Sequence, residues 1–254
     1  VRVAAIISLG LIPDPDKKAI PVLEKYFAEF RKKEEIICAH VPTAIARLLA
    51  GAPVADRQRY AETLIAELSE RASKSEQWLR PSFPQALGLL TKAEDPHAKK
   101  VFEAIQEKVE KELSKNAHVA YFGMMALGEI SGTDKPGNGV EEYLLTKAKT
   151  QGGRVMTRAW GALALGVAGF LQLSDKEKNY VPTEAVGSGL VEMMQGIKDP
   201  EQLGAYAVGI GLLRYQAGAA QLLKCFEEVK DDSFRGYFAT GLGLMGYRDA
   251  KTRI

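Results

Sequence analysis

The stretch VAYFGMMALG at residues 119–128 decides the fold, because similar stretches recur along the whole chain. All of them are rich in small and apolar residues, and they end at Gly10, Ala50, Gly88, Gly128, Gly166, Gly211 and Gly243. The steps between these ends are 40, 38, 40, 38, 45 and 32 residues. Recurrence at such a period is the sequence signature of a repeat protein.

A more charged type of segment lies between these copies, at 17–33, 56–73, 97–113, 139–149, 183–197 and 218–229. In 97–113, Val101, Ile105 and Val109 recur at four-residue steps, with Phe102 and Leu113 on the same face. That spacing predicts an amphipathic helix. No segment shows the sustained alternation of a strand. Each repeat therefore predicts an apolar helix, a turn and a charged helix, and the apolar sides of both helices are buried against neighbouring repeats.

Turn residues support these boundaries. Asp95-Pro96 and Asp199-Pro200 each predict a helix start, with Asp as the N-cap and Pro in the first helical position. The longest gap between segments, 171–183, predicts an exposed loop. Such insertions collect on one side of repeat arrays and are frequently part of the binding surface.

The degenerate pattern R-x-x-A-x-x-A-L-G in the apolar segments resembles the HEAT-repeat family. The resemblance covers essentially the whole chain and implies an all-α fold, a right-handed α-solenoid of about 6–7 helix pairs. It implies a single array over 1–254, in which the second helix of each pair lines the concave surface where partners bind. The motif is informative about architecture and not about function.

Both ends of the sequence fall inside a repeat. Val1 begins within an apolar helix, and Tyr247–Ala250 resembles the start of a charged one. Terminal repeats normally carry a polar outer side. We therefore expect either a fragment of a longer repeat chain or self-association through the exposed array ends.

The sequence GLGLMG at 241–246 matches the G-x-G-x-x-G fingerprint of dinucleotide-binding loops. That loop needs a preceding strand, a following helix and an acidic residue about 20 positions later. Here the glycines fall within and at the end of a predicted helix. We interpret them instead as positions where adjacent helices approach closely and where the first helix of a repeat ends.

Composition narrows the classes of function. The formal net charge is +2, which gives no support for nucleic-acid binding, and no apolar run is long enough for a membrane span. Cys38 and Cys225 lie in distant repeats and predict buried thiols without a disulfide, which slightly favours a reducing, cytoplasmic location.

Catalytic and metal-binding patterns are missing from the sequence. His40, His97 and His118 lie in different repeats with no metal-ligand spacing, and each is followed by Val or Ala. The triplet Gly187–Gly189 lacks the spacing of a nucleophile elbow. We therefore expect no enzyme activity, no cofactor and no metal site.

Aromatic residues recur five or six positions before the repeat glycine, at Phe83, Phe122, Trp160, Tyr206 and Tyr237. A position repeated in this way is usually core between repeats. The alternative is a ligand- or chromophore-binding, or lyase-like, HEAT protein that uses this aromatic ladder.

Charged residues opposite the apolar stripes form the candidate interaction surface. It comprises Lys18, Lys25, Arg59, Lys100, Glu103, Glu107 and Lys111 on the second helices, and Lys176, Lys178 and Tyr180 in the long loop. Exposed faces of this kind can also be merely solvated and carry i,i+4 ion pairs. The function we expect is a non-catalytic scaffold for protein–protein interaction, with a protein partner that the sequence does not identify.

Overall fold

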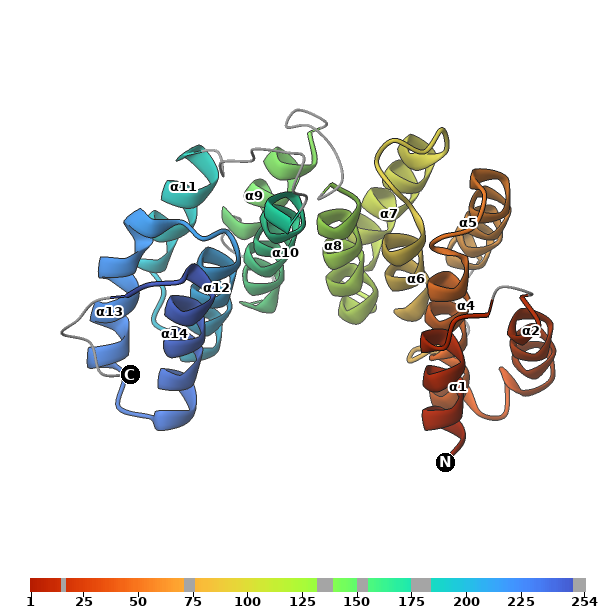
Figure 1. The fold of residues 1–254 in the computed structure, drawn as a ribbon. Coiled ribbons are helices and arrows are strands. Elements are labelled where there is room, and N and C mark those ends of the chain that lie inside the picture. The colour runs from red at the N-terminus through yellow and green to blue at the C-terminus, as the bar shows by residue number, and fades with distance from the viewer. Residues whose placement is uncertain (15–16, 71–75, 132–138, 150–154, 175–183, 249–254) are drawn as a thin grey trace. The chain divides into compact units, whose positions relative to one another are not determined.

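The computed structural model describes residues 1–254 except 15–16, 71–75, 132–138, 150–154, 175–183 and 249–254. Within the described ranges the chain forms helices joined by turns and has no strand, so the all-α class is confirmed (Figure 1). The chain divides into two compact units, Val1–Ile130 and Ser131–Ile254. In neither unit is a described helix long and apolar enough to cross a bilayer.

The first unit consists of two layers of helices. The apolar segments form α1 (Arg2–Leu11), α4 (Val41–Leu49), α6 (Ser82–Leu90) and α8 (Ala117–Ser131). The charged segments form α2 (Ala19–Phe30), α5 (Val54–Ser69) and α7 (Ala98–Glu112), and a single turn, α3 (Glu35–Cys38), precedes α4. The apolar helices pack in a row in chain order, and the charged helices cover one side of that row (Figure 1).

The second unit repeats this arrangement. Its row consists of α10 (Val155–Ser174), α12 (Pro200–Leu212) and α14 (Asp232–Met245). Against this row pack α9 (Val140–Lys149), α11 (Glu184–Met194) and α13 (Ala219–Glu228), with a short 3-10 turn, η2 (Gln216–Gly218), before α13. Each helix thus contacts helices that are near it in the sequence, as the repeated segments predict.

Small residues let the helices of each row come unusually close. A Cβ atom on Gly10 would lie 2.7 Å from the Cα of Ala44, and one on Gly88 would lie 2.8 Å from the Cα of Ala126. In the second unit, a Cβ atom on Gly166 would lie 2.6 Å from the Cα of Gly209, and one on Gly211 would lie 2.4 Å from the carbonyl oxygen of Gly241. No side chain fits at such distances, so the close approach predicted for these glycines is confirmed.

Two predictions about these glycines are wrong. Gly243 is exposed, and a Cβ atom there would meet nothing within 4 Å, so it makes no close contact. Gly166 does not end its helix, because α10 continues to Ser174. Helix α14 ends at Met245 and not at Gly243, and its C-cap residue, Gly246, adopts the left-handed conformation with φ of 72°.

The N-cap prediction is right at one Asp-Pro pair and wrong at the other. Asp199 accepts a hydrogen bond from the backbone N–H of Gln202 and caps α12, with Pro200 in the first position. Helix α7 begins only at Ala98, and its N-cap residue, His97, makes no side-chain cap bond. Asp95 is instead engaged by Arg57.

The ion pair between Arg57 and Asp95 connects two neighbouring repeats within the core. The side chains of Arg57 and Asp95 are 7% and 2% exposed. The guanidinium also donates to the carbonyl oxygen of Ala52, and the carboxylate also accepts the backbone N–H of Lys92. These bonds satisfy both buried charges, which would otherwise be costly to desolvate.

The two neighbouring glycines of α14 give a matched test of helix approach. Gly241→Ala places a Cβ atom 2.4 Å from the carbonyl oxygen of Ala207, whereas Gly243→Ala enters open space. We expect Gly241→Ala to lower the free energy of unfolding by about 2–3 kcal/mol, as overpacking does. Gly243→Ala should raise it by about 0.5–1 kcal/mol, because it reduces backbone entropy in the unfolded chain. Urea unfolding of the full chain measures both, and equal effects would contradict the contact.

A second prediction concerns the buried ion pair. Asp95→Ala leaves the Arg57 cation buried without its partner, so we expect a loss of about 3–5 kcal/mol in the free energy of unfolding. Lys111→Ala, which removes an exposed i,i+4 pair with Glu107, should cost less than about 1 kcal/mol. Chemical unfolding monitored by far-UV circular dichroism tests both, and a mild effect of Asp95→Ala would refute the role assigned to the pair.

Candidate functional site

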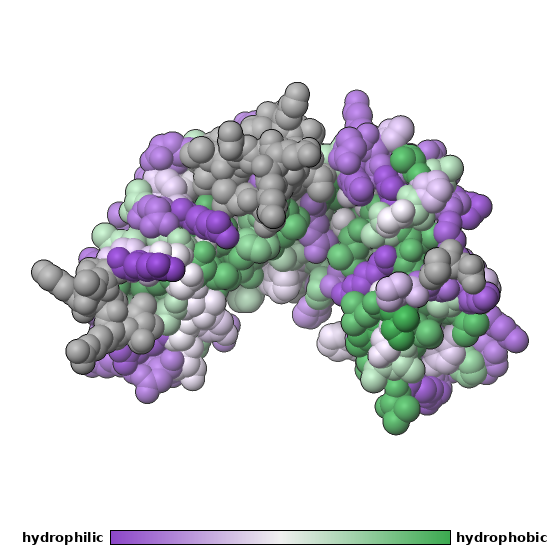
Figure 2. All heavy atoms as spheres, viewed as in Figure 1, coloured by the Kyte–Doolittle hydropathy of each residue, from purple (hydrophilic) through white to green (hydrophobic). Residues whose placement is uncertain are grey.

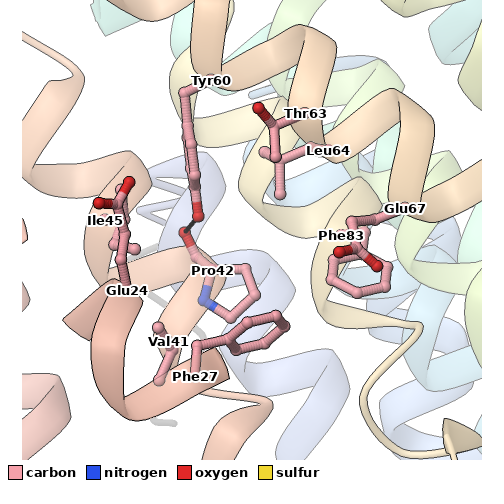
Figure 3. A pocket seen from close by; sticks show the side chains of 10 residues that line it. All are labelled: Glu24, Phe27, Val41, Pro42, Ile45, Tyr60, Thr63, Leu64, Glu67 and Phe83. Atoms are coloured by element: carbon pink, nitrogen blue, oxygen red, sulfur yellow. Dashed lines mark hydrogen bonds between the residues drawn. The ribbon is translucent and has the colours of Figure 1, made fainter. Parts of the chain in front are cut away.

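A groove of about 140 Å³ opens in the first unit between α2, α4, α5 and α6 (Figure 3). Its floor is apolar and its ends are acidic. The residues that line it are Glu24, Phe27, Val41, Pro42, Ile45, Tyr60, Thr63, Leu64, Glu67 and Phe83. Val41, Ile45, Leu64 and Phe83 are almost fully buried, so the floor is part of the packed core and is rigid.

The phenol of Tyr60 forms one wall of the groove. Its hydroxyl donates a 3.4 Å hydrogen bond to the carbonyl oxygen of Pro42, across the space between α5 and α4 (Figure 3). Burial raises the pKa of Tyr60 well above its ordinary value, and the carboxylates of Glu24 and Glu67 raise it further. Tyr60 is therefore neutral and acts as an amphipathic wall, not as an acid.

The two carboxylates at the ends of the groove differ in their partners (Figure 3). Glu67 receives two hydrogen bonds from Arg31, at 2.7 and 2.9 Å, and the same guanidinium also contacts Glu76. The bond to Glu67 raises the pKa of Arg31. Glu24 is exposed and forms no ion pair with any residue that the structure describes. Glu24 is thus the carboxylate that is available to a partner's cation.

The predicted surface residues lie on the solvent side of the second helices. Lys18, Lys25, Arg59, Lys100, Glu103, Glu107 and Lys111 are all exposed, along α2, α5 and α7. Lys111 forms an ion pair with Glu107 of the same helix, and Lys100 lies 3.7 Å from Glu62 of the neighbouring charged helix, α5. These contacts are those of a solvated face, and none of these residues lines the groove.

The predicted loop at 171–183 is only partly described. Residues 171–174 belong to α10, so the prediction of a loop is wrong for them, and Gln172 is 2% exposed. Lys176, Lys178 and Tyr180 lie outside the described residues.

The aromatic ladder is not a continuous feature. Phe83 and Tyr206 are buried, and the Tyr206 hydroxyl donates to the carbonyl oxygen of Ala148 at 2.8 Å. Phe122 and Trp160 are half-buried, whereas Tyr237 is 47% exposed and packs over Gly204. Of the five, Phe83 lines the groove.

The thiols and histidines show the surroundings of structural residues. Cys38 and Cys225 are buried and free, as predicted. Burial and the Glu34 carboxylate raise the pKa of the Cys38 thiol to about 11, so it is not a nucleophile at neutral pH. In the described part of the chain, no group of His, Cys, Asp and Glu is placed to hold a metal ion.

Glu129 is a buried carboxyl that the sequence analysis missed. It occupies the space left by the missing side chain of Gly88, because a Cβ atom there would lie 2.3 Å from Oε2 of Glu129. This oxygen has no hydrogen-bond partner among the described residues. Burial raises the pKa of Glu129 to about 7, and Arg47 opposes the shift. The signal in the sequence was the single acidic residue in the apolar run of α8.

A second hollow lies in the second unit, where Lys149 and Arg158 face Glu192 and Met193. Its volume is about 440 Å³, and it is more open than the groove. The two cations and one carboxylate make its lining polar, in contrast to the apolar floor of the groove.

Comparison of the chain with models of protein families, with curated proteins and with solved structures gives no match. The function must therefore be argued from the geometry of the chain itself.

The raised pKa of Glu129 predicts how stability depends on pH. The folded protein holds this proton up to about pH 7, whereas the unfolded chain releases it near 4.5, so stability falls as the pH rises through this interval. We expect Glu129→Gln to be more stable than the wild type at pH 8 by up to about 3 kcal/mol. The difference should shrink to less than about 1 kcal/mol at pH 5.

Urea unfolding at the two pH values measures this effect. Glu103→Gln, at an exposed position of α7, serves as the matched control and should change stability little at either pH. A gain from Glu129→Gln that is equal at pH 5 and pH 8 would rule out titration of Glu129 as its cause.

Proposed function

We propose that this chain is a non-catalytic binding protein, an α-solenoid of HEAT-like repeats that holds a partner polypeptide. The observation that carries the proposal is the apolar groove of the first unit, with Glu24 at its edge. Packing of each helix against its neighbours in sequence supports the solenoid, because repeats that stack in this way form extended binding surfaces.

The size of the groove favours a polypeptide over a small ligand. Sites for small molecules and cofactors typically enclose about 300–1,000 Å³. A space of about 140 Å³ suits one anchoring side chain of a larger partner, since such anchors in well-packed pockets dominate binding energy. Of the aromatic ladder, Phe83 alone lines this space, so the ladder does not form a chromophore site in the groove.

The chemistry of the lining indicates what that anchor would be. Phe27, Ile45 and Leu64 would contact an aliphatic or aromatic side chain. Glu24 lies at the edge without an ion pair, so a Lys or Arg next to the anchor would gain a partner there. The proposed partner segment therefore carries an apolar residue followed or preceded by a basic one.

A random peptide library displayed on phage and selected on the full chain tests this function. We expect enriched peptides with one large apolar residue beside Lys or Arg. Thr63→Trp fills the mouth of the groove from an exposed position of α5 and should weaken their binding at least tenfold. Glu24→Lys should weaken binding of the same peptides about tenfold, which corresponds to about 1.4 kcal/mol.

Ala66→Trp is the matched control, because Ala66 is also exposed on α5 but does not line the groove. It should bind the selected peptides as the wild type does. Peptides that bind Thr63→Trp and Ala66→Trp equally well would place the binding site elsewhere.

A further inference from the structure

The hollow of the second unit differs from the groove in size and in lining. Its volume of about 440 Å³ falls within the range of about 300–1,000 Å³ that is typical of small-molecule sites. The described residues that line it are Lys149 of α9, Arg158 of α10, and Glu192, Met193 and Gly196 of α11 and the turn after it. Three of these side chains carry a charge, so a ligand there would be recognised by its own charged groups.

Close packing of the helices determines where the two cations lie. A Cβ atom on Gly161 would lie 2.9 Å from the backbone nitrogen of Ala148, so α10 approaches the last turn of α9 closely. The stem of Lys149 reaches α11, because a Cβ atom on Gly189 would lie 4.0 Å from Cε of Lys149. Lys149 therefore lies beside α11 and next to α10, the helix that carries Arg158.

The wall behind these charges is rigid. Tyr206 of α12 is buried, and its hydroxyl donates to the carbonyl oxygen of Ala148 at 2.8 Å and lies 3.8 Å from Sδ of Met193. Burial raises the pKa of Tyr206, and the nearby guanidinium of Arg158 opposes this shift. Helices α9, α10 and α11 thus meet around one fixed phenol. The hollow is preformed, so a ligand would bind with little cost of ordering.

The charged groups of the hollow have no charged partners in the protein. No ion pair joins Lys149, Arg158 or Glu192 to another residue that the structure describes, so space remains between the two cations and the carboxylate. The Nε atom of Arg158 is buried and lacks a hydrogen-bond partner among the described residues. A buried N–H group left unpaired is costly, and an anion bound to this guanidinium would supply an acceptor.

Other charges near the hollow do not enter it. Asp199 accepts the backbone N–H of Gln202 and caps α12. Lys198 and Glu201 are exposed and do not line the hollow. In the sequence, residues 150–154 between α9 and α10 include no Asp or Glu. The two cations and the one carboxylate of the described lining therefore decide which ligand fits.

We propose that the hollow binds a small zwitterionic molecule. Its anionic group, a phosphate or a carboxylate, contacts Lys149 and Arg158, because ammonium and guanidinium groups form strong charge-assisted hydrogen bonds with such oxygens. Its ammonium group contacts Glu192, which is exposed and gains a partner. This site lies in the second unit, and it does not depend on the function proposed for the groove.

Isothermal titration calorimetry of the full chain with two pairs of probes tests the site. Phosphoethanolamine and β-alanine carry an anionic and an ammonium group, whereas ethyl phosphate and propionate are the matching anions without the ammonium. We expect saturable binding of at least one zwitterion, with a dissociation constant of about 1 mM or lower. That zwitterion should bind about fivefold or more tightly than its matching anion. The preference between phosphoethanolamine and β-alanine identifies the anionic group.

Charge variants locate the binding. Lys149→Gln should weaken binding of the zwitterion about fivefold and Arg158→Gln about tenfold or more, whereas Glu192→Gln should remove the preference over the matching anion. Lys198→Gln and Glu201→Gln make the same charge changes at exposed positions outside the hollow, and should change the dissociation constant less than about twofold. Circular dichroism confirms that each variant is folded. Because Lys149 and Glu192 are exposed, their variants test the site even if Arg158→Gln does not fold.

Three outcomes would overturn the proposal. They are the absence of saturable binding of either zwitterion, an equal loss from Lys149→Gln and Lys198→Gln, and equal affinity of the wild type for a zwitterion and its matching anion. The last outcome would make the hollow a site for simple anions.

Discussion

The close approach of the apolar helices is the constraint on which the rest of the structure depends. Where Gly166 meets Gly209, and Gly211 meets Gly241, backbone contacts backbone, so the distance between repeats is set by atoms that cannot move aside. Contacts of the same kind at Gly10 and Gly88 fix the row of the first unit. Because the row is close-packed, loops one repeat apart come within hydrogen-bonding reach, as Glu35 and Trp78 show.

The sequence period predicted both types of helix and the role of small residues, because these depend on composition along the chain. It did not predict which small residue meets the neighbouring helix. Gly241 and Gly243 are two positions apart, which turns their directions by about 200° around a helix. Only Gly241 can therefore face α12. Gly243 matches the repeat pattern in the sequence but does not pack against a neighbouring helix. The prediction at Asp95 failed for a related reason: a local capping preference lost to Arg57, which is 38 residues away in sequence.

The sequence did not predict the groove, because a groove forms where packed side chains leave space between them. Phe27, Pro42 and Tyr60 come from three helices, and each has the spacing of an ordinary core residue. The space between them depends on the packing angles of those helices, which periodicity does not give. The exposed charges on α2, α5 and α7 could be predicted, because the face opposite an apolar stripe must be in water. These exposed charged residues do not line the groove.

The groove and the exposed charged faces of α2, α5 and α7 would bind a partner by different physical means. In the groove, the contact is mainly apolar and the Glu24 carboxylate supports it, so salt weakens it little. On the charged faces, side chains such as Lys25 and Arg59 would act through water, and such attraction is screened within about 8 Å at physiological ionic strength. A partner anchored in the groove would therefore remain bound at salt concentrations that release one held by exposed charges alone.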